Sequence, residues 1–289
     1  MSPLLSVEHL SISFIQYDRG TSRRILPAIR DLDLTIDRGQ VAAVVGSSGS
    51  GKSLLAHGIL GILPYNAHME GTITYDGAPL TPKRAAALRG REIVLVPQSV
   101  GYLDPLMKVG PQVGRDKKAV RAVLDRYGLG PETEGLYPFQ LSGGMARRVL
   151  ISTAVAASPA LVIADEPTPG LDARAAGRIL GHFRELALTI ADKVAVFYAG
   201  ETVEEAPAGD FDRLEDLRHP YTRALWQALP QHGFHPIPGT QPYPGALPEG
   251  CPFAPRCPKR TSECGGEVPY RPLDGGFVRC LHPERGNAS

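Results

Sequence analysis

The sequence has almost no net charge, no long apolar run and no cysteine before Cys251. Its 31 basic and 30 acidic residues give a net charge of +1, so long-range attraction gives no support for nucleic-acid binding. No apolar run reaches the length of a membrane span, because Ser158-Pro159 breaks the longest candidate, Val149 to Ala164. Residues 1–5 carry no basic side chain and are too short for a signal peptide. We therefore expect a cytosolic protein that reaches a membrane only through a partner.

The composition changes near residue 208, which predicts two domains of unequal size. With 43% hydrophobic residues, the 289-residue chain can form one large or two modest cores. Short alternating runs over residues 4–45 predict an antiparallel β layer that leads into a buried strand at Val41–Val45. From about Pro207 onward Pro, Gly and Cys become frequent, so we predict a domain at residues 1–207 and an extension at 208–289.

Residues 46–53 match the phosphate-binding pattern G-x-x-x-x-G-K-[ST] at every position. Glycines let successive backbone N–H groups point at phosphate oxygens, and the helix expected from Leu54 adds its positive N-terminal dipole. Lys52 is expected to reach the β- and γ-phosphates, and the Ser53 hydroxyl to ligate Mg²⁺. The alternative is a Gly/Ser-rich loop that ends in Lys-Ser by chance. The predicted phosphate-binding residues are Gly46, Ser47, Ser48, Gly49, Ser50, Gly51, Lys52 and Ser53.

Two acidic residues follow the apolar run Leu161–Ala164, which predicts a strand of a parallel sheet. Asp165 is expected to hold Mg²⁺ through water, and Glu166 to polarise the attacking water. Solvated charges at a strand end are the alternative, which a phosphate loop earlier in the chain makes less favourable.

Ser142-Gly143-Gly144 precedes a helical run and predicts a second anion cradle at a helix N-terminus. The alternative is an ordinary helix cap with Ser142 as the cap residue. One chain needs only one cradle for a γ-phosphate. A second one therefore suggests that two chains sandwich the nucleotide.

Together these motifs resemble the ATP-binding subunit of an ATP-binding cassette (ABC) transporter. Leu141–Met145 resembles the family's signature motif, Asp165-Glu166 the end of its Walker B motif, and Gly170–Asp172 its D-loop. Gln98 matches the glutamine that in the family touches Mg²⁺ and couples the site to the membrane subunits. The resemblance implies an α/β P-loop NTPase core with an antiparallel β layer and a helical subdomain at about residues 99–158.

Three further segments narrow the resemblance to ATPases of dipeptide, oligopeptide and nickel importers. They are Tyr137–Met145, His219–Leu225, and Ile237–Gly239 followed by Gly250–Pro258. The segments Leu60–Pro64 and Leu103–Met107 lean toward the nickel or metal-chelate branch.

The resemblance implies a peripheral ATPase on the cytoplasmic face of the cell membrane. Its partners would be two membrane-spanning permease subunits, a second ABC ATPase subunit and, indirectly, a solute-binding protein. An aromatic near the N-terminus, Phe14 or Tyr17, is expected to stack on adenine. The main rival is an ABC ATPase acting in translation or DNA repair, but such proteins usually carry two cassettes or a long coiled-coil insertion.

All four cysteines, Cys251, Cys257, Cys264 and Cys280, lie in the last forty residues. Disulfides are unexpected in a cytosolic chain, and the spacing is not a usual zinc-finger pattern. Some related importer subunits bind a [4Fe–4S] cluster through four such cysteines. The alternatives are a structural zinc and free buried thiols.

One part of the family pattern has no counterpart in the sequence. ABC ATPases carry a strand after the D-loop helix that ends in a histidine contacting the γ-phosphate. Between Asp172 and Val194 the only histidine is His182, which lies within the predicted helix Ala173–Leu186. The strand and short loop that the sequence lacks would comprise on the order of 15 residues. Their absence suggests an alternative function, a regulatory ATP-binding subunit with weak hydrolysis.

Overall fold

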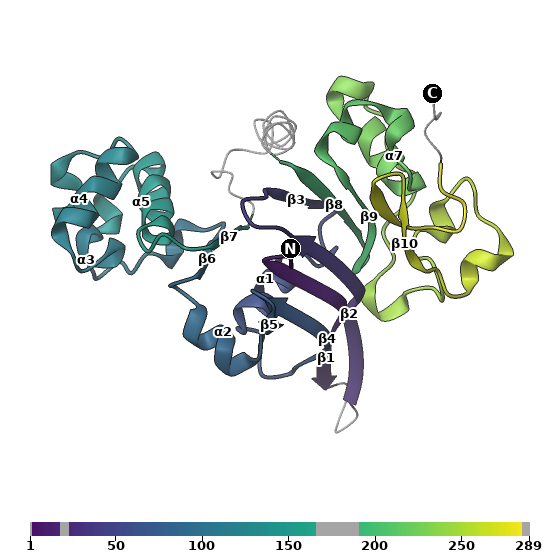
Figure 1. Cartoon of the computed structure of the whole chain (residues 1–289), viewed down its shortest axis with the longest axis horizontal. Coiled ribbons are helices and arrows are strands. Elements are labelled where there is room, and N and C mark those ends of the chain that lie inside the picture. The colour runs from purple at the N-terminus through teal and green to yellow at the C-terminus, as the bar shows by residue number, and fades with distance from the viewer. Residues whose placement is uncertain (1, 18–22, 166–190, 285–289) are drawn as a thin grey trace. The chain divides into compact units, whose positions relative to one another are not determined.

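The computed structural model describes residues 2–17, 23–165 and 191–284 (Figure 1). The chain divides into two units, Met1–Thr81 with Arg178–Ser289 and Pro82–Gly177. Each unit has its own hydrophobic core. Among the described residues no helix is long and apolar enough to cross a membrane.

The first unit contains a four-stranded antiparallel sheet in the order β2-β1-β4-β5. Its strands are β1 (Leu5–Tyr17), β2 (Arg23–Ile36), β4 (Ala67–Tyr75) and β5 (Ala78–Pro79). Apolar side chains at alternate positions, such as Leu10, Leu32 and Leu34, are at most 2% exposed, as expected for a sheet with one buried face. The predicted antiparallel layer is therefore confirmed.

A second sheet of the same unit carries the phosphate loop, and its strand order is β10-β11-β9-β8-β3. The strands are β3 (Ala42–Gly46), β8 (Lys193–Tyr198), β9 (Glu201–Pro207), β10 (Tyr270–Leu273) and β11 (Gly276–Arg279). β3 and β8 run parallel, and β8 and β9 form an antiparallel hairpin. The helix α1 (Lys52–Leu60) follows β3.

The C-terminal residues complete this sheet. β11, which lies in the predicted extension, pairs with β9, which lies in the predicted first domain, so one sheet contains strands from both. The domain boundary at residues 207 and 208 stays a prediction. The helix α7 (Pro220–Gln227) contributes Tyr221, which packs against Tyr198 of β8 and against Phe253 at ring-centroid distances of 4.4 and 5.3 Å. This aromatic cluster gives a segment rich in proline a core that it shares with β8.

The second unit is mostly helical. Its elements are α2 (Pro82–Leu88), β6 (Ile93–Val96), α3 (Val109–Val113), α4 (Lys117–Arg126), α5 (Gly143–Val155) and β7 (Leu161–Ala164). Val109, Leu124 and Val149, from α3, α4 and α5, are at most 1% exposed and lie in one core. β6 and β7 form a two-stranded parallel sheet. The parallel strands of the described chain thus belong to two sheets.

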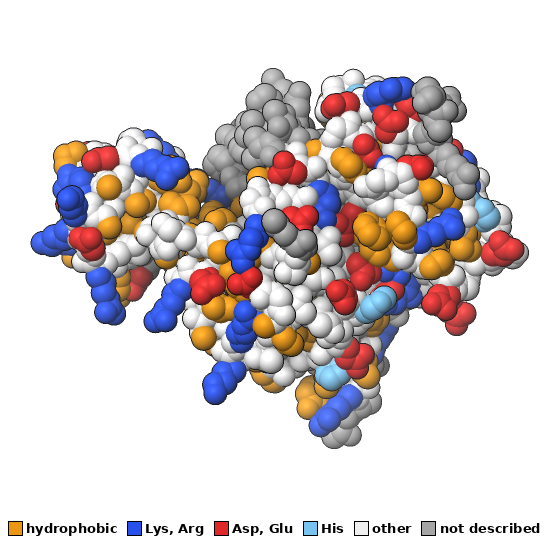
Figure 2. Space-filling model, in the orientation of Figure 1, with side chains coloured by type: hydrophobic (Ala, Val, Ile, Leu, Met, Phe, Trp, Pro, Cys, Tyr) orange, Lys and Arg blue, Asp and Glu red, His pale blue; other side chains and the backbone are white. Residues whose placement is uncertain are grey.

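Short 3₁₀ helices occur in many of the connections of both units. They are Val100–Tyr102, Pro131–Gly135, Pro138–Gln140, Ala208–Asp212, Leu214–Asp216, Pro230–His232, Pro244–Ala246, Ala254–Arg256 and Ser262–Gly265. On the face drawn in Figure 2, basic and acidic side chains are interspersed, in agreement with the balanced composition.

Candidate functional site

The phosphate loop joins β3 to α1 and has the backbone conformation that its glycines allow. Gly49 and Gly51 have φ angles of 77° and 105°, in the region that other residues rarely adopt. A Cβ on Gly46 would lie 2.4 Å from the carbonyl oxygen of Phe197 on β8, so this close approach also requires glycine. The motif's glycines are therefore explained by local backbone conformation at Gly49 and Gly51 and by close packing against β8 at Gly46.

Lys52 lies inside the loop that it closes. Its Nζ donates hydrogen bonds to the carbonyl oxygens of Gly46 and Ser47, at 3.0 and 3.1 Å. Lys52 and Ser53 are the first two residues of α1, whose N-terminus carries a partial positive charge. An ammonium group, backbone N–H groups and a helix N-terminus thus meet at one place, which suits an anion such as a phosphate.

The C-terminal extension also reaches the phosphate loop. The Ser47 hydroxyl hydrogen-bonds to Oε1 of Gln241. Two arginines hold the backbone of this segment: Arg256 Nε donates to the Pro238 carbonyl at 2.6 Å, and Arg24 Nη2 donates to the Gly245 carbonyl at 3.0 Å. Sequence analysis missed Gln241, because only tertiary packing brings residues 47 and 241 together.

In the second unit, Gln98 and Asp165 follow two neighbouring parallel strands. Val96 of β6 is paired with Ala164 of β7, and the backbone N–H of Asp165 donates to the Val96 carbonyl at 3.0 Å. The two strands therefore end at the same edge of their sheet, as the motifs predict for a shared Mg²⁺ site.

The predicted helix after Ser142 is confirmed as α5, which begins at Gly143. The Ser142 hydroxyl accepts a hydrogen bond from the backbone N–H of Met145 at 3.3 Å, so Ser142 is the helix cap. Gly143 and Gly144 are exposed, and a Cβ on either would meet no other described residue within 4 Å. The N-terminus of this helix is therefore open to a second molecule.

Arg147 connects α5 to the Gln98 segment. Its side chain is buried, and Nη1 donates to the carbonyl oxygens of Pro97 and Gln98, at 3.2 and 2.8 Å. Burial lowers the pKa of the Arg147 guanidinium, because no described carboxylate pairs with it. Sequence analysis missed this residue, since an arginine two positions after the signature carries no signal by itself.

Several predicted residues lie outside the described part of the chain. They are Glu166, the D-loop segment Gly170–Asp172 and His182. The phosphate loop belongs to the first unit, whereas Gln98, Asp165 and Ser142–Gly144 belong to the second.

Both candidate aromatics for adenine lie on β1. Phe14 is half-buried and opposite Leu26 of β2. Tyr17 is 69% exposed, and the guanidinium of Arg23 lies 5.5 Å from its ring centroid. The contact with adenine stays a prediction for both side chains.

The four cysteines line one cavity, together with His219 and His282. Among the described residues, no three of the cysteine sulfurs lie within 4.8 Å of one another. A tetrahedral zinc ion with Zn–S bonds of about 2.3 Å would need sulfurs about 3.8 Å apart. The four sulfur atoms that line this cavity are thus spaced more widely than the sulfur ligands of a single zinc ion.

Burial disfavours the thiolate form of three of these cysteines when no cation is bound. It raises the pKa of Cys251 to about 11 and that of Cys280 to about 12, and the pKa of Cys257 is also raised by burial. Neutral buried thiols are inert, but a metal centre deprotonates its thiolate ligands on binding. The same burial lowers the pKa of His219 to about 3, so its imidazole is neutral.

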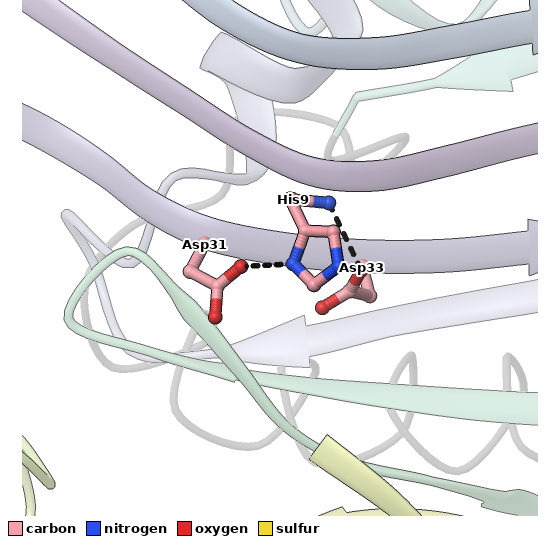
Figure 3. A group of neighbouring side chains, drawn as sticks. All are labelled: His9, Asp31 and Asp33. Carbon is pink, nitrogen blue, oxygen red and sulfur yellow. Dashed lines mark hydrogen bonds and ion pairs between the residues drawn. The ribbon is translucent and has the colours of Figure 1, made fainter. Parts of the chain in front are cut away.

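A further polar group, which sequence analysis missed, lies where β1 and β2 bulge (Figure 3). His9 Nδ1 is 2.6 Å from Asp31 Oδ1, and the His9 backbone N–H donates to Asp33 Oδ1 at 3.0 Å. Arg279 of β11 forms ion pairs with both carboxylates, at 2.8 Å for Asp33. The cationic Arg279 side chain supplies the positive charge that a metal ion would otherwise bring. We therefore describe this group as an ion-pair network that joins the extension to β2.

Comparisons with known proteins match two family models. Residues 29–169 match the ABC transporter family, and residues 203–264 match the oligopeptide/dipeptide transporter C-terminal region. The second match contains Gln241 and three of the four cysteines.

Among curated relatives, the chain is 34% identical to the dipeptide transport ATP-binding protein DppD of Bacillus subtilis, covering 97% of this chain and 95% of that protein. It is also 34% identical to the oligopeptide transport ATP-binding protein OppD of Haemophilus influenzae, covering 91% of this chain and 92% of that protein.

Solved structures of ABC ATPases have a similar fold. The ATP-binding cassette MJ0796, dimeric and bound to ADP and Pi, has a TM-score of 0.55 at 23% identity, over 71% of this chain and 98% of that one. CbiO1 of Clostridium perfringens has a TM-score of 0.53 at 25% identity, over 73% and 90% of the two chains. The predicted P-loop fold is confirmed.

The chain is shorter than the Bacillus relative within the aligned region. The alignment has 324 positions but takes in 97% of the 289 residues, about 280, so about 44 positions hold no residue of this chain. This shortfall exceeds the roughly 15 residues expected for a strand and its loop. None of the comparisons favours a regulatory subunit with weak hydrolysis.

Proposed function

Because the chain belongs to the oligopeptide/dipeptide family of ABC transporter ATP-binding subunits, we propose that its ATP hydrolysis energises the import of peptides. Relatives named for dipeptide and oligopeptide transport that align over nearly their whole length support peptides as the cargo. Nickel and metal chelates receive no specific support from the comparisons.

In this proposal the phosphate loop binds the ATP triphosphate, and the observation that carries it is the position of Lys52. The Lys52 ammonium is already held inside the loop at the start of α1, and needs to exchange its two carbonyl acceptors for phosphate oxygens. Ser53 and Gln98 would bind Mg²⁺ directly and Asp165 would hold it through water, and such oxygen donors suit this hard cation. Glu166 orients and polarises the attacking water.

The exposed N-terminus of α5 completes the nucleotide site of a second subunit. Ser142, Gly143 and Gly144 would present backbone N–H groups to the γ-phosphate on the partner ATPase, with which this chain would close head to tail. Arg147 of α5 would link the γ-phosphate contact to the Gln98 segment, because its guanidinium donates hydrogen bonds to the carbonyl oxygens of both Pro97 and Gln98. Closure driven by ATP would move the Gln98 segment against the permease subunits.

The subunit would act on the cytoplasmic face of the membrane, bound to two permease subunits, with a solute-binding protein delivering the cargo. Its four cysteines would hold a [4Fe–4S] cluster, since they line one cavity with sulfurs spaced more widely than zinc requires. When bound, a [4Fe–4S] cluster supplies four iron–sulfur bonds to the protein and one-electron redox chemistry. Cys251, Cys257, Cys264 and Cys280 would bind it as thiolates and thereby staple the extension.

A binding measurement on Lys52→Ala tests the phosphate site. Each charge-assisted hydrogen bond is worth about 1.5–3 kcal/mol, so loss of the ammonium is expected to weaken ATP binding by at least about tenfold. The titration uses purified protein, a fluorescent ATP analogue and no Mg²⁺, with Lys117→Ala at the start of α4 as the control. If Lys52→Ala and Lys117→Ala bind alike, the phosphate loop does not hold the nucleotide.

A second variant tests the contribution of α5 to the partner's site. Gly143→Ala adds a methyl group that meets no described residue within 4 Å, so it should leave the fold and ATP affinity of the single subunit intact. If the partner's nucleotide packs here, the methyl group blocks ATP-driven dimerisation, which gel filtration detects in a hydrolysis-blocked background. Dimerisation at the wild-type ATP concentration would contradict the sandwich.

A further inference from the structure

A buried histidine at the start of α7 has one ring nitrogen without a partner. His219 is 1% exposed. Its Nδ1 accepts a hydrogen bond from the backbone N–H of Tyr221 at 3.0 Å and so caps the helix. Within the described residues, Nε2 has no hydrogen-bond partner.

The cap fixes which nitrogen carries the proton. Because Nδ1 uses its lone pair to accept the Tyr221 N–H, the proton of the neutral imidazole is on Nε2. Nε2 is therefore an N–H donor. A buried donor without an acceptor bears the full cost of its desolvation, so such a group calls for an acceptor close to it.

The orientation of this donor is set by a second buried residue. Glu204 of β9 is fully buried, and its carboxylate accepts hydrogen bonds from the backbone N–H groups of Arg218 and His219, at 2.9 and 2.8 Å. The imidazole is thus held through its backbone by Glu204 and through Nδ1 by the helix. It cannot turn Nε2 toward solvent without breaking the cap.

The ring lines the same cavity as the four cysteines, and Phe253 packs beside it with ring centroids 6.0 Å apart. A neutral thiol is a weak acceptor, whereas a thiolate or sulfide carries the negative charge that strengthens an N–H···S hydrogen bond. The second histidine of the cavity differs, because Nε2 of His282 is already 2.8 Å from the Thr261 hydroxyl. Of these two imidazoles, it is His219 whose ring nitrogen is buried without a partner among the described residues.

We propose that Nε2–H of His219 donates a hydrogen bond to a sulfur of the iron–sulfur centre bound by the four cysteines, and so raises its reduction potential. This inference rests on the proposed cofactor. Reduction adds negative charge to the centre, and a donor aimed at its sulfur stabilises the reduced state more than the oxidised one. His219 is a positioning residue in this scheme and not an iron ligand.

The test compares His219→Asn with His282→Asn in the full-length protein. Asparagine is a strong helix cap, so His219→Asn keeps an acceptor for the Tyr221 N–H while its shorter side chain no longer presents a donor to the cavity. Protein is reconstituted anaerobically with Fe²⁺ and sulfide, iron and sulfide are counted, and the midpoint potential is measured by a redox titration followed by electron paramagnetic resonance.

His219→Asn is expected to keep the wild-type iron content and to lower the midpoint potential. A tenfold loss in the reduced-to-oxidised ratio at a fixed potential corresponds to about 59 mV for a one-electron couple. His282→Asn is expected to leave the potential unchanged. A deuterium-sensitive shift of the Fe–S vibrations, present in the wild type and absent in His219→Asn, would support the same hydrogen bond.

The failures of the two proposals are distinct. A wild-type protein that takes up no iron and sulfide would overturn the proposed cofactor. A wild-type protein with a full cluster whose potential and vibrations match those of His219→Asn would overturn the hydrogen bond alone. If His219→Asn only lowers the melting temperature, equally with and without the cluster, the role of His219 is structural and the inference is wrong.

Discussion

Replacement of Arg279 by methionine is expected to destabilise the first unit strongly. Arg279 is 7% exposed, and its guanidinium donates to Asp33 Oδ2 at 2.8 Å and to the carbonyl oxygens of Asp31 and Thr202, at 2.8 and 3.2 Å. It also lies 5.4 Å from the ring centroid of Tyr270. One side chain of β11 therefore neutralises β2 carboxylates and satisfies two backbone groups.

The magnitude follows from the charge that would be left behind. Asp33 is 8% exposed, so removing its cation leaves a buried carboxylate without a counter-ion, which costs about 3–5 kcal/mol. Methionine keeps most of the apolar stem of the side chain, so lost packing contributes little. At about 2–4 °C per kcal/mol, the melting temperature is expected to fall by about 6–20 °C.

The loss should depend on pH in a defined direction. Burial raises the pKa of Asp33 above its usual value, and Arg279 opposes that rise. Without Arg279 the pKa rises further, so Asp33 ionises less readily in the folded variant than in the unfolded one. The destabilisation is then largest at pH values above the folded pKa, and it diminishes as the pH falls through that pKa and Asp33 becomes neutral.

Circular dichroism melts at pH 8 and pH 5 measure both effects. Arg213→Ala is the matched control, because Arg213 pairs with Glu215 on the surface, where its side chain is 65% exposed. Surface pairs contribute about 0–1 kcal/mol. If Arg279→Met melts within 2 °C of Arg213→Ala at both pH values, the network that joins β11 to β2 does not stabilise the fold.

Three further predictions concern single residues of the first unit. The hydrogen bond to Asp31 raises the pKa of His9, so NMR titration should place that pKa above 6.5, and Asp31→Asn should lower it. The His9–Asp31 pair stabilises the fold below pH 6.5, and this contribution is lost as the pH rises through the folded pKa. An unchanged His9 titration in Asp31→Asn would refute the contact. Gln241→Glu should weaken ATP binding roughly tenfold by placing negative charge at the phosphate loop, whereas Gln231→Glu, at an exposed position of the 3₁₀ helix Pro230–His232, should not. Equal affinities of the two variants would show that Gln241 does not lie at the phosphate loop. Gly46→Ala should lower both the melting temperature and ATP affinity, because its Cβ would lie 2.4 Å from a β8 carbonyl oxygen, and wild-type values for both would contradict this packing.

The elements that local pattern defines were predicted well. Alternating apolar residues gave β1 and β2, a continuous apolar run gave β7, and a serine followed by two glycines marked the start of α5. The phosphate loop was predicted for the same reason, since its function depends on backbone conformations that only glycine adopts readily. In these cases the physical cause lies within a few residues of the chain.

Contacts between distant segments could not be predicted in this way. The hairpin of β10 and β11 was missed, because its short strands gain their stability by pairing with β9, about seventy residues earlier. Gln241 at the phosphate loop and Arg147 at the Gln98 segment were missed for the same reason. Their side chains have no role until the fold supplies a partner.

By itself the sequence determined that this chain binds a polyphosphate and belongs with the transport ATPases, because glycines, a lysine and acidic residues at fixed spacing encode that chemistry locally. Only the tertiary structure decided that four cysteines spread over thirty residues line one cavity and that His219 shares it with a free donor. Burial and hydrogen-bond satisfaction are properties of the packed chain, so they arise only where the extension, including α7, packs against β8.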